Sequence, residues 1–528
     1  MMTIEQKGTV ATTNNKGNHA APPTSGGICA LSASTLAAKI RRGEISAVAA
    51  VEAYIERLQA VNPALNALVV PRFTEARAEA AEIDRRRAAG DALGPLAGVP
   101  VTIKECLDLA GTPSTGGVPW RKSVKAKADE RHVARLRAAG AVVLGKTNVG
   151  QLLLMIETDN PLYGRTNHPQ SAERSPGGSS GGEGALLAAG ASALGLGTDL
   201  GGSVRVPAAF CGVVAIKPTT GRCDDLGRLS VPLGQRAIAS QVGVLGRSVG
   251  DVGLGLGVIN GGPQPAQDGS LTPAMPLGDP AAVDVSRLRV AYYDDDNTFT
   301  PSPAIRRAVA ESAATLAARG ATVTRWSPPD VRQALDLFFS VLAADGFAGA
   351  RRALGRDKRD RRIALMEMAI RRTGLVRLLL GASGRRRLKT EVVANYGRTD
   401  TDHYWQLVER IVDYRQRFLE AMQGFDVILC PAVSLPAFRH GAVEELILGG
   451  AYTCLYNVLG WPAGVVPVTR VRPGEESDRP PSKDRMDRAA IETERGSAGL
   501  PVGVQIAARP WREDQVLATM GALESAVA

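Results

Sequence analysis

The sequence is poor in the residues that hold metal ions and form disulfides. Its five histidines and six cysteines are scattered over 528 residues, without paired histidines at ligand spacing or a CxxC motif. This pattern argues against metal catalysis and predicts free thiols in a reducing compartment. We therefore expect an active site without a metal and without a cofactor.

Long apolar runs are also absent. No stretch reaches the roughly 18 uninterrupted apolar residues that a transmembrane helix requires. Residues 1–27 are polar and lack the apolar segment of a signal peptide. We expect a disordered tail over 1–30 and a cytoplasmic protein whose remaining residues, 31–528, form one globular domain.

Positive charge is concentrated in one segment. The net charge is +10, and residues 351–389 contain 14 lysines and arginines against three acidic residues. The rest of the chain is nearly neutral, which argues against a nucleic-acid-binding protein. The sequence predicts one basic, cap-like segment over 351–389.

Helical and strand patterns alternate along the chain, which predicts an α/β fold with strands in the middle. Ser32 and Ser46 are expected helix N-caps, and Asn62–Pro63 the end of the first helical region. Further helices are expected over 73–89, 130–139 and 303–319, and strands over 96–103, 141–144, 288–293, 425–431, 463–471 and 500–507. The last two strands are expected to pair, with 472–498 as a surface excursion between them.

Two familiar motifs match the sequence but lack the structure that they need. Residues 140–147, GAVVLGKT, fit the P-loop pattern, yet 141–144 is itself a strand pattern where a phosphate-binding loop should be. Residues 177–181, GGSSG, fit the nucleophile elbow of α/β-hydrolases, yet a polar, proline-terminated stretch precedes them instead of a strand. We reject both interpretations.

The most informative stretch is 175–220, where glycines flank Ser179 and Ser203 and alternate with apolar runs. Such glycines let backbone approach backbone or substrate closely. Without histidine or metal, a serine nucleophile needs another base, and a buried lysine can serve. Lys104, at the end of a predicted buried strand, is the candidate. Alone, each of these residues would be an ordinary strand-end lysine or turn serine.

The run GGSSGGEGALLAAGASALGLGTDLGGSVRVPAAFCGVVAIKPT closely resembles the signature of the amidase signature family, and GVPVTIKE resembles its lysine segment. The resemblance implies one α/β/α domain with a large mixed sheet covered by helices. It implies that Ser203 is the nucleophile that forms an acyl-enzyme, Ser179 a bridging serine on a cis peptide bond, and Lys104 the base.

The resemblance also implies supporting roles for neighbouring residues. Asp199 and Arg205 would form an ion pair that shapes the loop, and Ser180 would contribute a hydrogen bond. The oxyanion hole would consist of backbone N–H groups of Leu200, Gly201, Gly202 and Ser203.

Three further segments resemble fatty acid amide hydrolases: 288–300, 452–469 and 499–511. The substrate implied is an N-acyl amide with an apolar acyl group, and the enzyme a hydrolase of linear amide C–N bonds. Expected substrate contacts are Leu153, Leu154, Leu375, Leu378 and Leu379. Residues 370–389 are either a peripheral membrane-binding helix or a solvated basic helix, and both interpretations stay open. A homodimer also stays open.

Two other functions with the same catalytic set remain. One is a general aryl- or short-chain acylamidase, and the other is the glutaminase subunit of a tRNA amidotransferase, which works only in a partner complex. A non-enzymatic binding protein is disfavoured because Lys104, Ser179 and Ser203 are all present.

Overall fold

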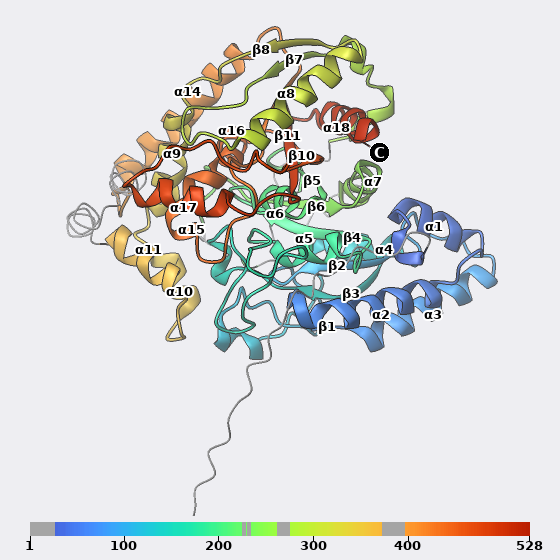
Figure 1. Cartoon of the computed structure of the whole chain (residues 1–528). Coiled ribbons are helices and arrows are strands. Elements are labelled where there is room, and N and C mark those ends of the chain that lie inside the picture. The colour runs from blue at the N-terminus through green and yellow to red at the C-terminus, as the bar shows by residue number, and fades with distance from the viewer. Residues whose placement is uncertain (1–26, 224–228, 230–233, 261–274, 372–395, 528) are drawn as a thin grey trace, which may run out of the picture.

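The computed structural model describes residues 27–223, 229, 234–260, 275–371 and 396–527. They contain one eleven-stranded mixed sheet in the order β1-β3-β2-β4-β6-β5-β10-β11-β9-β7-β8, which runs from the bottom of Figure 1 to the top. Its strands are β1 Leu68–Pro71, β2 Pro100–Lys104, β3 Val142–Thr147, β4 Leu194–Asp199, β5 Val214–Lys217, β6 Gln241–Gly246, β7 Arg289–Tyr292, β8 Thr322–Arg325, β9 Val427–Pro431, β10 Ala463–Arg470 and β11 Pro501–Ala508.

Helices cover both faces of this sheet. Strand β4 shows the arrangement, because neighbouring residues of a strand point to opposite faces. A Cβ at Gly195 would meet Glu183 of α5, whereas the preceding residue, Leu194, lies beside Gly255 of α7. The helices are α1 Ala33–Arg41, α2 Ala47–Leu65, α3 Phe73–Ala88, α4 Arg131–Ala138, α5 Gly181–Ala188, α6 Arg205–Cys211, α7 Val249–Asn260, α8 Pro303–Ala318, α9 Val331–Ala343, α10 Ala348–Leu354, α11 Arg361–Arg371, α14 Thr401–Ala421, α15 Val443–Leu446, α16 Cys454–Leu459, α17 Arg485–Glu494 and α18 Glu513–Val527. The expected α/β fold with a large mixed sheet is confirmed.

The first helical region follows the prediction at its start but not at its end. Ser32 and Ser46 cap α1 and α2 by accepting the N–H of Thr35 and Ala49. However, α2 continues through Pro63 to Leu65. The proline lies in the last turn, where the single backbone hydrogen bond it removes is tolerated. Asn62 then closes the helix, because its side-chain Oδ1 accepts the N–H groups of the residues at 67 and 68.

Two other expectations need correction. The strand expected over 96–103 begins only at Pro100, because Gly98 adopts a positive φ of 73° and residues 96–99 form a turn. The tail expected over 1–30 lies outside the described residues up to 26, and Ile28–Ala30 form a 3₁₀ turn. Residues 142–147 form strand β3, so the residues that match the P-loop pattern do not form a phosphate-binding loop.

Strands β10 and β11 pair, as predicted, and they are antiparallel. The segment 472–498 between them was expected on the surface, but part of it is buried. It contains α17, whose Met486 and Ala490 are buried. The buried Arg174 guanidinium holds this segment by donating to the carbonyl oxygens of Thr493 at 2.8 Å and Arg495 at 2.9 Å. A charged group that donates to several carbonyls in this way anchors the excursion to the core.

None of the described helices combines the length and the apolar character needed to cross a membrane.

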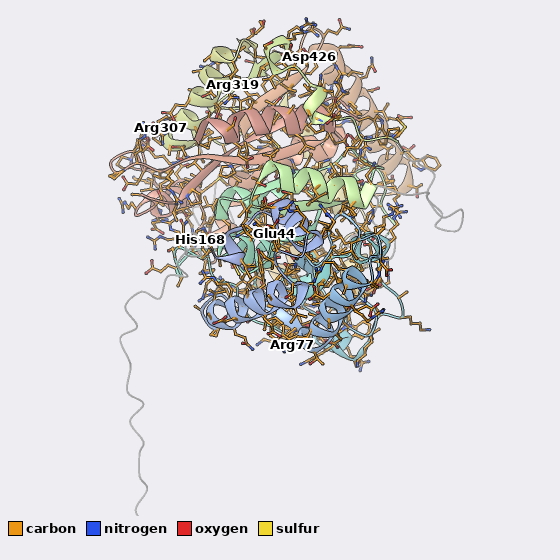
Figure 2. All side chains as sticks on the ribbon, turned by 90° about the vertical axis from the view of Figure 1, so that its right-hand side faces the viewer. Glu44, Arg77, His168, Arg307, Arg319 and Asp426 are labelled. Carbon is orange, nitrogen blue, oxygen red and sulfur yellow. The ribbon has the colours of Figure 1, made fainter. Side chains whose placement is uncertain are left out.

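His168 lies in the loop that leads to the glycine- and serine-rich stretch, and Figure 2 labels it. Its Nε2 lies 2.8 Å from the carbonyl oxygen of Phe210 on α6, and its Nδ1 accepts the N–H of Gln170 at 3.1 Å. This pair of partners suits a neutral ring, because a proton on Nδ1 would face the Gln170 N–H. Burial lowers the pKa of His168 to about 4.

We predict that stability falls as the pH drops from about 6.5 to about 4, because the folded chain binds this proton more weakly than the unfolded chain. A shift from 6.5 to 4 corresponds to about 3 kcal/mol lost across that window. His168→Gln should flatten the melting temperature between these pH values, and the exposed His403→Gln should not. An unchanged acid-side slope in His168→Gln would contradict this assignment.

Candidate active site

Lys104 ends strand β2 inside the protein. Its side chain is fully buried, and Nζ lies 2.8 Å from Ser179 Oγ, 2.9 Å from Thr198 Oγ1 and 3.2 Å from the Thr198 carbonyl oxygen. Strands β2 and β4 are adjacent and parallel, so the ends that carry Lys104 and Thr198 meet at one edge of the sheet. The expected partnership of Lys104 and Ser179 is therefore present as a direct contact.

Ser179 precedes helix α5 and follows a cis peptide bond between Gly178 and Ser179. The glycine is required by packing, because a Cβ at position 178 would lie 2.5 Å from the backbone nitrogen of Glu157. Ser179 itself is fully buried. The residues directly before it form loops and turns, which confirms that the nucleophile-elbow pattern has no preceding strand.

Ser203 lies in the turn that joins β4 to α6. It is 9% exposed, whereas Lys104 and Ser179 are 0% exposed, so Ser203 is the most accessible of the three. Its carbonyl accepts the Ser180 N–H at 3.2 Å, which ties the two serine loops together. Among the described residues, Ser203 Oγ has no hydrogen-bond partner.

The loop before Ser203 has a fixed backbone. Gly202 has a φ of 115°, and a Cβ there would lie 2.0 Å from Thr453 Oγ1. The Gly201 carbonyl accepts hydrogen bonds from Thr453 Oγ1 at 2.8 Å and from Cys454 Sγ at 3.4 Å. These contacts orient the peptide between the two glycines.

One residue of the expected oxyanion hole is already engaged. The Gly202 N–H donates to Asp199 Oδ1 at 2.8 Å, so it points to this carboxylate. Within the described part of the chain, the N–H groups of Leu200, Gly201 and Ser203 have no acceptor. The prediction that all four N–H groups face a substrate oxygen therefore needs correction at Gly202.

Asp199 and Arg205 form the expected ion pair, with Nη2 and Oδ1 2.9 Å apart and both side chains fully buried. Burial alone would raise the pKa of Asp199, but the Arg205 guanidinium and its hydrogen bonds hold it well below its usual range. Arg205 also donates to the Thr453 carbonyl, Gln505 Oε1 and Asn457 Oδ1. The pair thus joins the loop to β11 and α16.

The remaining predicted site residues have different outcomes. Ser180 contributes its hydrogen bond through its backbone N–H, which donates to the Ser203 carbonyl, whereas its Oγ is buried without a hydrogen-bond partner among the described residues. Leu153 and Leu154 lie at the turn Gln151–Leu153, and Leu154 packs on a small cluster that includes Phe347 of the loop before α10 and Leu354 of α10. Leu375, Leu378 and Leu379 lie outside the described residues.

Sequence patterns missed several residues of the site. Thr198 could have been found, because it directly precedes Asp199 in the same run. Thr453, Asn457 and Gln505 lie within the segments 452–469 and 499–511, but their contacts with Arg205 could not be found, because they depend on the tertiary packing of distant parts of the chain. Across the residues that the structure describes, no three histidine, cysteine, aspartate or glutamate side chains could together hold a metal ion.

Comparison with known proteins agrees with this geometry. A model of the amidase family matches residues 49–517. The chain belongs to the amidase family. Fatty acid amide hydrolase 1 of Caenorhabditis elegans is 34% identical to this amidase over 516 residues, which cover 93% of the chain and 87% of the relative. A solved structure of fatty acid amide hydrolase matches with a TM-score of 0.85 at 26% identity, covering 95% of this chain and 86% of that one.

A relative with another function is also similar. A glutamyl-tRNA(Gln) amidotransferase subunit from Synechococcus sp. (strain CC9605) is 32% identical over 446 residues, covering 81% of this chain and 88% of that one. The family and its hydrolase members identify this amidase as an amide-cleaving hydrolase.

We predict that Arg205→Met destabilises the fold by about 3–5 kcal/mol, because Asp199 would stay buried without its counter-ion. The double variant Asp199→Asn/Arg205→Met should lose less than the sum of the two single changes. Urea unfolding followed by tryptophan fluorescence measures these differences. The control is Arg77→Met at an exposed pair with Glu52, labelled at the lower end of Figure 2, where a much smaller loss is expected because solvent screens the pair. Additive losses at the buried pair would contradict the coupling.

Proposed function

We propose that this amidase is a serine hydrolase of the Ser-Ser-Lys type, with Ser203 as nucleophile, Ser179 as proton relay and Lys104 as base. The observation that carries the proposal is the buried 2.8 Å contact between Lys104 Nζ and Ser179 Oγ. An amine enclosed in this way favours its uncharged form, because burying an ammonium ion costs several kcal/mol. Only an uncharged amine can accept a proton.

The reaction begins with two proton transfers. Lys104 takes the proton of Ser179, and Ser179 takes that of Ser203 as Ser203 Oγ bonds to the amide carbonyl carbon. The second transfer requires Ser203 Oγ to reach Ser179 Oγ, and no described residue holds Ser203 Oγ in another position. When the C–N bond breaks, the relay returns a proton to the leaving amine. Water then attacks the acyl-enzyme by the same route and releases the carboxylic acid.

The tetrahedral intermediate places a negative charge on the former carbonyl oxygen. The N–H groups of Leu200, Gly201 and Ser203 are the donors available to it, and one such donor contributes on the order of 2.7–4 kcal/mol to lowering a barrier. Gly202 supports this arrangement by donating to Asp199, which holds the loop in place.

The substrate we propose is an N-acyl amide with an apolar, fatty acyl group. The similarity to fatty acid amide hydrolases favours it, and so does the side chain that covers the loop before Ser203. A Cβ at Gly201 would lie 2.7 Å from Phe338 Cζ of α9, so an apolar ring forms one wall beside the oxyanion donors. Leu153 and Leu154, and the undescribed Leu375, Leu378 and Leu379, remain proposed acyl contacts.

Peripheral membrane binding through 370–389 remains a proposal, because 372–395 lie outside the described residues. The described helix α11, at the start of this segment, exposes Leu365 and Met368 one turn apart. An exposed apolar pair beside arginines is compatible with an anionic membrane surface. A cytoplasmic location and a homodimer likewise remain proposals.

The acyl-length profile separates the proposed substrate from the two alternatives. We expect purified protein alone to hydrolyse N-acyl amides with kcat/KM rising from acetyl to long-chain fatty acyl groups, because a longer chain buries more apolar surface. A maximum at acetyl or aryl substrates would identify a short-chain or aryl acylamidase instead. Glutamine hydrolysis that appears only with partner subunits would identify the glutaminase.

The proton relay is tested by three alanine variants. Lys104→Ala, Ser179→Ala and Ser203→Ala should each lower kcat by on the order of 10³-fold or more, because the members of one relay fail together. Ser302→Ala, another buried serine whose Oγ has no described partner, is the control and should keep its activity. If Ser179→Ala keeps most of its activity while Lys104→Ala loses it, Ser179 only shapes the loop.

A further inference from the structure

A second ionisable side chain is buried behind the site, and the relay does not use it. Glu183, in the first turn of α5, is fully buried. Its Oε1 accepts the Thr147 hydroxyl at 2.8 Å, and its Oε2 lies 2.6 Å from Thr102 Oγ1. Thr147 is the cross-strand partner of Lys104, and Thr102 precedes Lys104 by two residues on β2. Glu183 therefore joins the helix that follows Ser179 to β2, which carries Lys104, and to the neighbouring strand β3.

The hydrogen bonds around Glu183 reveal its protonation state. Four oxygen atoms stand in a row: Glu183 Oε2, Thr102 Oγ1, Ser192 Oγ and the Leu194 carbonyl oxygen. The distances between successive atoms are 2.6, 3.0 and 2.9 Å. Each of the three contacts requires one proton, because two oxygens without a proton between them repel each other.

The row does not contain enough hydroxyl protons for these contacts. The two hydroxyl groups supply one proton each, and the Leu194 carbonyl supplies none. With one proton in each contact, the third proton comes from the Glu183 carboxyl. The row then runs in one direction, with Glu183 donating to Thr102, Thr102 to Ser192, and Ser192 to Leu194.

We propose that Glu183 is a protonated carboxylic acid that positions Ser179 against Lys104 without giving Lys104 a counter-ion. This inference rests on the proposed roles of Lys104 and Ser179. A carboxylate at this place would favour the charged form of Lys104, which cannot act as a base. A neutral acid fastens α5 to β2 and β3 equally well and leaves the amine uncharged.

The charges around Glu183 agree with this assignment. Burial raises the pKa of Glu183 to about 8, against the opposing effects of Thr102, Thr147 and Lys104. Of the other elements packed on α5, β4 and α6 carry Asp199 and Arg205, which pair with each other, and β6 carries no charged residue. Lys146 of β3 is engaged with the Pro113 carbonyl and Ser114 Oγ.

Infrared difference spectroscopy tests the protonation state without any assay of activity. The spectrum of the wild type minus that of Glu183→Gln at pH 7 should contain the C=O stretch of a protonated carboxylic acid, shifted in D₂O. The other carboxyl groups cancel in this difference. Carboxylate bands in place of the C=O stretch would overturn the proposal. This result does not depend on whether Ser203 is the nucleophile, so failure here is distinct from failure of the proposed function.

Kinetics tests the positioning role. Glu183→Leu should lower kcat by on the order of 100-fold, the effect of a displacement of about 1 Å at a reacting group. Glu183→Gln should restore kcat to within about threefold of the wild type, because its amide donates to Thr102 and accepts from Thr147 as the neutral acid does. The melting temperature of each variant separates loss of positioning from loss of fold.

The pH profile of kcat/KM completes the test. If Glu183 is neutral, the acid limb of the profile should lie at the same pH in Glu183→Gln and in the wild type. If Glu183 were a carboxylate, its removal would let Lys104 lose its proton more easily and move this limb to lower pH. A Gln variant with a displaced limb, or one as inactive as the Leu variant, would overturn the proposal.

Discussion

The amino group of Lys104 is enclosed at the edge of the sheet, and the arrangement of the site depends on the cost of that burial. A charged ammonium ion in this position would lose its hydration, and the two side chains within hydrogen-bond distance of it, Ser179 and Thr198, are neutral. In the proposed mechanism, this burial supplies the base that a serine uses. The parallel pairing of β2 with β4 brings Lys104 to the loop that carries Ser203.

The same site contains a charged pair and, by our proposal, a neutral acid, and the two have different roles. Asp199 keeps its charge because Arg205 compensates it. Arg205 also donates to the Thr453 carbonyl and to Gln505 Oε1, so the pair connects the loop to distant parts of the chain. Glu183 is buried among hydroxyl groups, which carry no positive charge, and in our proposal a proton neutralises its carboxyl group instead. Negative charge is therefore held at the nucleophile loop and kept away from the base. In the proposed mechanism, this distribution of charge lets one small region contain both a stabilised carboxylate and an uncharged lysine.

The sequence predicted the α/β fold, the caps at Ser32 and Ser46 and the contact between Lys104 and Ser179, because these follow from local patterns and from a long signature. It was wrong about Pro63, since a proline in the last turn removes only one backbone hydrogen bond and does not end the helix. It also placed Gly202 among the oxyanion donors, because the path of its N–H toward Asp199 depends on the three-dimensional loop. The contacts of Thr453, Asn457 and Gln505 with Arg205 could not be found, since they depend on how α16, the residue before it and β11 pack against the loop.

The central claim is that Ser203 carries the acyl group while Lys104 and Ser179 deliver the protons. Rapid quenching of the enzyme with a long-chain N-acyl amide, followed by mass spectrometry of its peptides, tests this claim most directly. The account predicts an acyl adduct on Ser203 that is absent from Ser203→Ala and forms far more slowly in Lys104→Ala. An adduct on Ser179, or turnover without any adduct on Ser203 under conditions where acylation is faster than hydrolysis, would contradict it.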